Sequence, residues 1–184
     1  IHMKRVFFPG FVLLLFLSGC TSDAVIEEPL GEGGPVAEPF PSWSSSSHNS
    51  EEFNGSMFEN ESYVAYFSAP WCAHCEATLD AYDQTLPDGK MMVFSYDGRE
   101  DYSDMNGWHN KTETNLNRTV DRPFMLNPSL AEEVNLSNIP FVLFVNEQGY
   151  VHHIEVGRIT DSEAISELWN GTLTATVDDT GYWN

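Results

Sequence analysis

At 184 residues, the chain has room for one globular domain of ordinary size together with some unstructured length. Acidic residues outnumber basic ones by 28 to 8, which gives a formal net charge of -20. Nucleic acid and anionic membrane surfaces would repel this charge, so we expect no nucleic-acid partner. The chain holds three cysteines, and an odd number indicates that one of them is free or modified.

The first twenty residues have the pattern of an export signal. Met-Lys-Arg at residues 3–5 is followed by a mostly apolar run at 6–17, which is short for a membrane span, and by Leu-Ser-Gly-Cys at 17–20. We therefore predict a signal peptide at residues 1–19. The last four residues resemble the lipobox of exported lipoproteins, which implies lipidation at Cys20. An uncleaved membrane helix is the alternative, and both readings place the protein on the outer face of the cytoplasmic membrane or in the periplasm.

Residues 20–54 are rich in Gly, Pro, Ser and acidic side chains and hold few apolar ones. Such a composition buries too little apolar surface to offset the entropy lost by an ordered backbone. We therefore expect a flexible tether here, followed by a domain at residues 55–171. For the tail at residues 172–184, the choice between a short strand and disorder stays open.

The domain begins with strand and helix patterns in alternation. Residues 62–68 are rich in aromatic and β-branched types and predict a buried strand. After Cys72, apolar residues recur at helical spacing as far as Leu86. The apolar run at residues 91–96 is typical of a strand covered on both faces of a parallel sheet. A strand, a helix and a strand in that order predict a right-handed crossover unit.

The middle of the domain is less regular. Residues 97–122 are polar and predict one short helix at most, before a strand-like segment at 123–126. Ser129 and Glu132 fit a capping box, which predicts another short helix.

The last part of the domain has clear patterns again. Residues 141–145 predict a buried strand, and a Gly-containing hairpin joins it to a partner strand at 150–156. Thr160 and Glu163 fit a second capping box and predict a helix that ends at residues 170–171.

Two cysteines stand at the first strand-to-helix junction. Cys72 and Cys75 enclose Ala73 and His74 and follow directly on Trp71. The first sulfur then lies near the unpaired N–H groups of a helix N-terminus, whose partial positive charge favours thiolate over thiol. The second sulfur, one turn later, is close enough to attack a mixed disulfide formed on the first. The spacing predicts a pair that exchanges two electrons with the cysteines of another protein.

These residues resemble a known family. Phe-Ser-Ala-Pro-Trp-Cys-Ala-His-Cys at residues 67–75, with Ile139 and Pro140 directly before a strand, a hairpin and a last helix, resembles the thioredoxin superfamily. The long stretch between the second strand and this proline is similar to the insertion of membrane-anchored, TlpA-like and redoxin-type members. The resemblance implies an α/β thioredoxin fold, in which helices flank a central mixed β-sheet.

The resemblance also implies an activity and a site. It implies a thiol-disulfide oxidoreductase in which Cys72 is the nucleophile, Cys75 resolves the mixed disulfide and Pro140 is a cis-proline beside both. The residues expected to tune the thiolate or line the substrate groove are Trp71, Ala73, His74, Ile139 and Pro140. We expect a monomer that needs no cofactor besides its redox-active disulfide. The expected partners are exported proteins with thiols or disulfides and a membrane redox partner.

The direction of electron flow stays open. His74 can place a positive ring near the Cys72 sulfur, and a stabilised thiolate makes the disulfide a stronger oxidant. Carboxylates on the following helix oppose the thiolate; they are Glu76, Asp80 and Asp83. The buried acid that thioredoxins carry six residues before the first cysteine is replaced by Tyr66, which favours an oxidase or isomerase. The tether and the insertion favour a reductase.

Two other functions fit parts of the sequence. A copper or zinc carrier would use Cys72 and Cys75 with His152 and His153. Neighbouring strand residues point to opposite faces, so we expect ordinary strand residues there and no metal site. A non-catalytic peptide-binding module would use the groove by Pro140 and keep the cysteines as an inert disulfide.

The chain also holds six Asn-x-Ser/Thr triplets without proline between. Such triplets arise by chance in an Asn- and Thr-rich chain, but six in an exported protein predict glycosylation of some, where the host has the machinery. The asparagines are Asn54, Asn60, Asn110, Asn117, Asn135 and Asn170.

Overall fold

A computed structural model describes residues 35–184 of the chain. The predicted signal peptide at 1–19, lipidation at Cys20 and the first part of the tether lie outside the described residues and stay predictions. Within residues 35–184, no helix is both long and apolar enough to cross a membrane.

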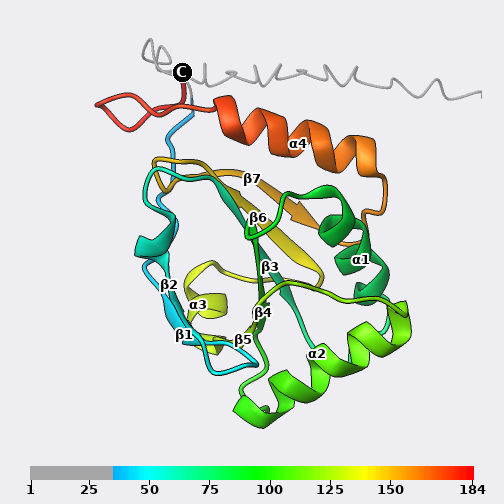
Figure 1. Ribbon diagram of the computed structural model, residues 1–184. Coiled ribbons are helices and arrows are strands. Elements are labelled where there is room, and N and C mark those ends of the chain that lie inside the picture. Colours follow the sequence, from blue (N-terminus) through cyan, green and yellow to red (C-terminus); the bar gives the residue numbers. More distant parts are fainter. Residues whose placement is uncertain (1–34) are drawn as a thin grey trace, which may run out of the picture. The chain divides into compact units, whose positions relative to one another are not determined.

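A central sheet positions the rest of the domain. Its strands are β3 (Tyr63–Ser68), β4 (Met91–Ser95), β5 (Phe124–Leu126), β6 (Phe141–Val145) and β7 (Val151–Val156). They lie in the order β5-β4-β3-β6-β7 (Figure 1). β4 pairs in parallel with β3 and β5, whereas β6 pairs antiparallel with β3 and β7. The predicted central mixed sheet of an α/β fold is confirmed.

Helices cover both faces of this sheet. They are α1 (Cys75–Thr85), α2 (Tyr102–Leu116), α3 (Pro128–Glu133) and α4 (Ser162–Thr174). Because side chains alternate along a strand, Tyr66 joins one core cluster with Leu79 of α1 and Trp169 of α4. Its neighbour Phe67 joins a second cluster with Leu130 of α3. Figure 1 shows α1 and α4 beside each other, and the two helices are in contact.

The segment 35–54 is ordered, which corrects the prediction of a flexible tether through residue 54. It contains a hairpin of β1 (Ser44–Ser46) and β2 (Glu52–Asn54), followed by the short 3-10 helix η1 (Gly55–Phe58). Beyond β1, Ser47 bridges to Met125 at the β5 edge of the sheet. The segment is therefore part of the domain.

Trp43 anchors this segment. Its side chain is 6 % exposed, and its ring lies edge-on to Phe94 of β4 at a centroid distance of 5.1 Å. The indole Nε1 donates a hydrogen bond of 3.2 Å to the Tyr63 hydroxyl. The prediction failed because average composition does not detect one large aromatic side chain that fills a site built by later strands.

The insertion between β4 and β5 contains a longer helix than predicted. α2 has 15 residues and begins at a capping box between Asp101 and Asp104. Gly107 in its interior lowers its intrinsic helix propensity. Burial of Met105 and Trp108 against the sheet supplies the packing that the polar sequence does not reveal.

Three helix ends also differ from the predictions. α3 is capped by Asn127 rather than Ser129, because Pro128 takes the first helical position. α4 is capped by Asp161 rather than Thr160 and continues to Thr174. The tail then forms isolated bridges, in which Val177 pairs with Trp183 and Val36 with Tyr182.

Candidate functional site

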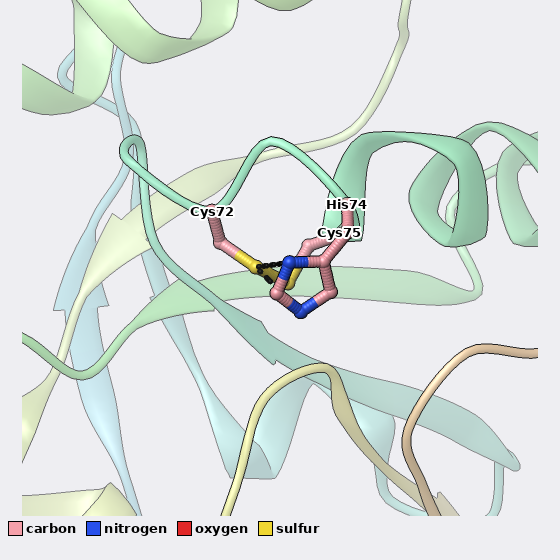
Figure 2. A group of neighbouring side chains, drawn as sticks. All are labelled: Cys72, His74 and Cys75. Atoms are coloured by element: carbon pink, nitrogen blue, oxygen red, sulfur yellow. Dashed lines mark hydrogen bonds between the residues drawn. A yellow bond between two sulfur atoms is a disulfide. The ribbon is translucent and has the colours of Figure 1, made fainter.

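The two cysteines lie where β3 leads into α1. Cys72 stands in the turn before the helix and Cys75 is its first residue; the Cys75 N–H donates to the Cys72 carbonyl at 3.0 Å. The two sulfurs form a disulfide, with Cα atoms 5.4 Å apart (Figure 2). Cys72 is 5 % exposed and Cys75 is 2 % exposed. An oxidised cysteine pair therefore lies at the N-terminus of α1.

His74 lies over the disulfide. Its side chain is exposed, and its Nε2 and Nδ1 atoms are 3.5 Å and 3.7 Å from the Cys72 Sγ (Figure 2). A protonated imidazole at this distance stabilises a thiolate on Cys72 when the disulfide opens.

Two arginines that follow α2 offset the negative charges of carboxylates on α1. Arg118 donates to Asp80 at 3.1 Å and also pairs with Asp83. Arg122, which is buried, donates to Asp83 at 2.6 Å. Asp80 and Asp83 therefore oppose the Cys72 thiolate less than the sequence suggested, because their charges are neutralised.

α2 brings two further polar side chains to the motif. Asn115 donates a hydrogen bond of 2.7 Å to the carboxylate of Glu76. The Lys111 ammonium lies 3.4 Å from the Pro70 carbonyl, two residues before Cys72. The helix of the insertion thus supplies the cation that the sequence around the cysteines lacks.

Tyr66 stands six residues before Cys72, at the position where thioredoxins carry a buried acid. It is fully buried, and its hydroxyl donates a hydrogen bond of 2.9 Å to the Cys75 carbonyl. Burial raises the pKa of Tyr66, so the phenol stays protonated at neutral pH. The group beneath Cys75 is therefore a neutral donor, which holds the helix start and does not accept a proton from Cys75.

Trp71 is held by a residue that the sequence analysis missed. Its side chain is 53 % exposed, yet its Nε1 donates a hydrogen bond of 2.9 Å to the Asp97 carboxylate after β4. Hydrogen bonds from Arg99 hold the pKa of Asp97 well below its usual range. No local motif identifies Asp97 as a site residue. The one indication in the sequence is its position just after the buried strand β4, which pairs with β3.

Pro140 is the residue directly before β6. The Ile139–Pro140 peptide bond is cis, and the Pro140 carbonyl accepts a hydrogen bond of 2.8 Å from Gly157. A groove of about 880 Å³ borders the motif. It is lined by Trp71, His74, Tyr96, Glu132, Leu136 and Ile139, among others. A smaller hollow of about 140 Å³ is lined by Cys72, Ala73 and Cys75.

The predicted alternative metal ligands on β7 are not brought to the cysteines. His152 Nδ1 lies 3.1 Å from the Thr172 hydroxyl, and His153 Nε2 lies 3.3 Å from the Glu155 carboxylate. Among residues 35–184, the side chains grouped closely enough to share a metal ion are Cys72, His74 and Cys75. His152 and His153 do not belong to this group, which speaks against the alternative ligand set.

The asparagines of the six triplets lie at the surface, apart from half-buried Asn54. Asn135 lines the large groove. Their glycosylation stays a prediction.

Comparison with known proteins identifies the fold. No protein-family model and no curated protein matches the chain. The exposed lipoprotein thioredoxin of Streptococcus pneumoniae superposes with a TM-score of 0.59 and 18% identity, over 71% of this chain and 98% of its own. A thiol:disulfide interchange protein of the thioredoxin family from Chlorobium tepidum gives 0.60 and 16%, over 76% and 98%. The chain has the thioredoxin fold.

A secreted Mycobacterium tuberculosis disulfide oxidoreductase has the same thioredoxin fold, with a TM-score of 0.55 and 14% identity over 70% of this chain and 95% of its own. In this chain, the thioredoxin fold places the disulfide at the start of α1 and the cis bond of Pro140 at the start of β6. Sequence reasoning identified the cysteines, His74 and Ile139 in this region, and missed Asp97, Lys111 and the two arginines that neutralise α1.

Proposed function

We propose that this protein is a thiol-disulfide oxidoreductase that exchanges disulfides with exported proteins through Cys72 and Cys75. The observation that carries the proposal is the disulfide at the N-terminus of α1, next to a groove lined by Trp71, His74 and Ile139. The solved structures of the same fold, described as a thioredoxin, an interchange protein and a disulfide oxidoreductase, support it.

Oxidation of a substrate takes two exchange steps. A substrate thiolate attacks the Cys72 sulfur, the disulfide breaks, and its electron pair leaves on Cys75, which takes up a proton. A second substrate thiolate then attacks the substrate sulfur of the mixed disulfide and releases Cys72 as a thiolate, which takes up the second proton when it becomes a thiol. The substrate has lost two electrons and two protons, and the protein has gained them. Reduction of a substrate runs through the same steps in reverse, with Cys72 as the attacking thiolate and Cys75 as the resolving one.

We infer that oxidation of substrate thiols is the favoured direction. The imidazole of His74 faces the Cys72 sulfur, and Arg118 neutralises carboxylates on α1 that would destabilise the thiolate. Because a stabilised thiolate favours the reduced form of the protein, the disulfide becomes a stronger oxidant. The neutral phenol of Tyr66 also offers Cys75 no base, and a base there would serve reductive turnover.

The proposed location is outside the cytoplasm, with a lipid anchor at Cys20. The export pattern of residues 1–19 supports it, as does the fold shared with an exposed lipoprotein and a secreted oxidoreductase. An oxidant in this location needs a membrane redox partner that accepts the two electrons from the reduced pair.

The test is oxidation of a peptide that carries two thiols. The oxidised parent should form one peptide disulfide per protein chain in a single turnover, whereas Cys72→Ser and Cys75→Ser should form none. Ser44→Ala, which removes an exposed hydroxyl on β1 and leaves both sulfurs, is the control and should stay active. Equal conversion by Cys72→Ser would overturn the proposal.

A redox titration against glutathione tests the direction. Thioredoxin has a potential of about -270 mV and the oxidant DsbA about -120 mV. We expect a value above about -200 mV, on the oxidising side of these two. A value near that of thioredoxin would contradict the proposed direction and leave the exchange itself intact.

A further inference from the structure

Three soft or borderline donor groups meet at the start of α1. The ligand atoms of Cys72, His74 and Cys75 all lie within 4.8 Å of one another. Figure 2 shows the His74 ring turned back toward the two sulfurs. In the oxidised protein the sulfurs are joined, and neither can act as a thiolate ligand.

We propose that the reduced form of this protein binds a thiophilic cation such as Zn²⁺ through Cys72, His74 and Cys75. This inference uses the dithiol state that the proposed function also requires, but it goes beyond exchange chemistry. Two thiolates and an imidazole form a ligand set that selects zinc or copper(I) over magnesium or calcium.

The geometry of the motif already approaches that of a metal site. Around a tetrahedral zinc ion, Zn–S and Zn–N bonds of about 2.3 Å and 2.05 Å place sulfur and nitrogen about 3.5 Å apart. The separation between the Cys72 Sγ and the His74 Nε2 is 3.5 Å. The imidazole therefore needs little movement to become a ligand once the sulfurs separate.

The reaction that opens the site is the exchange itself. Two thiols of a substrate give up two electrons and two protons to the disulfide, which becomes two cysteine thiols. The cation then displaces two thiol protons, and neutral His74 binds through one ring nitrogen. Three protein ligands leave the fourth position of a tetrahedral ion for water.

The chain has an acidic surface, with 28 acidic residues against 8 basic ones. Glu132 lines the large groove, and Glu76 lines the smaller hollow together with Lys111. His74 itself lines the large groove, so an ion can enter from solvent on that side. Because the ion would hold both sulfurs, exchange should stop until a competing chelator removes it.

The test uses the whole chain, reduced and free of oxygen, titrated with Zn²⁺ against a chromogenic chelator. We expect one Zn²⁺ per parent chain, at least about tenfold weaker binding in His74→Ala, and no stoichiometric binding in Cys75→Ser. His153→Ala is the matched control: it removes a partly exposed histidine on β7 and should bind as the parent does. His74 is exposed, so its replacement does not remove core packing.

Co²⁺ provides a second measurement that reports the ligands directly. Thiolate-to-cobalt charge-transfer bands should appear in the parent, and the ligand-field bands should change in His74→Ala but not in His153→Ala. Equal zinc affinity and identical cobalt spectra in the parent and His74→Ala would overturn the proposal. Peptide oxidation is measured separately, with the metal-free oxidised protein. If the protein binds zinc but does not oxidise the peptide, the result contradicts the proposed function and not the zinc site.

Discussion

Arg118 donates a hydrogen bond of 3.1 Å to the carboxylate of Asp80, although 38 residues separate the two along the chain. The same guanidinium pairs with Asp83, which Arg122 also binds, so two arginines after α2 offset two acids on the helix that begins at Cys75. The charge around the candidate thiolate is thus set by the insertion as well as by the motif.

Arg118→Gln should raise the pKa of the Cys72 thiol, because it leaves Asp80 without its arginine partner and Asp83 with Arg122 alone. The pH dependence of Cys72 alkylation in the reduced protein measures this pKa. Lys90→Gln is the matched control, since it removes one positive charge paired with Glu61 before β4. An unchanged or lower thiol pKa in Arg118→Gln would show that the pairing does not act on Cys72.

Tyr66→Phe should lower the free energy of unfolding by about 1 kcal/mol, because it removes the buried hydrogen bond from the Tyr66 hydroxyl to the Cys75 carbonyl. The pH profile of exchange should not move, since the phenol stays protonated throughout. Tyr82→Phe is the control: its buried hydroxyl has no hydrogen-bond partner among the described residues, so its loss should cost little. Urea unfolding and single-turnover exchange measure the two effects, and a shifted pH profile in Tyr66→Phe would assign the phenol a role in proton transfer.

Asp97→Asn should destabilise the protein at neutral pH and much less in acid. The pKa of Asp97 is lower in the folded state than its unfolded value of about 3.9, so its contribution is fully present above about pH 4. That contribution is lost as the pH falls through the lower folded pKa. The difference in free energy of unfolding between the parent and Asp97→Asn, measured from pH 7 to pH 2, should narrow progressively below about pH 4. The exposed Asp88→Asn serves as control, and a gap that widens in acid would contradict the assignment.

Trp43→Ala should lower the free energy of unfolding by about 3 kcal/mol or more, the usual cost of truncating a buried tryptophan. Trp71→Ala removes the same type of side chain from an exposed position and should cost clearly less. Urea unfolding of both variants measures the difference. Equal, small losses would mean that the segment 35–54 does not stabilise the domain.

The sequence alone was sufficient to predict the strands of the sheet and the residues at the centre of the candidate site. Strands such as β6 are continuous apolar runs, and the motif around Cys72 and the Ile139–Pro140 pair lie within short stretches of sequence. Local patterns of this kind depend on neighbouring residues, so they can be read without the fold.

The remaining features depend on contacts between distant segments. The pairing of Arg118 with Asp80 and the bond from Trp71 to Asp97 span 38 and 26 residues. The order of the segment around Trp43 likewise depends on strands that come later in the chain. No periodicity or composition encodes such pairings, because they arise only when the sheet brings the elements together.

Trapping of a mixed disulfide tests the central claim most directly. Reduced Cys75→Ala retains Cys72 without its resolving partner, and is mixed with a peptide that contains one intramolecular disulfide. We predict a covalent adduct at Cys72, visible by mass spectrometry and released by dithiothreitol, and no comparable adduct in Cys72→Ala. Absence of the adduct in Cys75→Ala, with the variant folded, would contradict the assignment of Cys72 as the exchanging nucleophile and favour an inert disulfide.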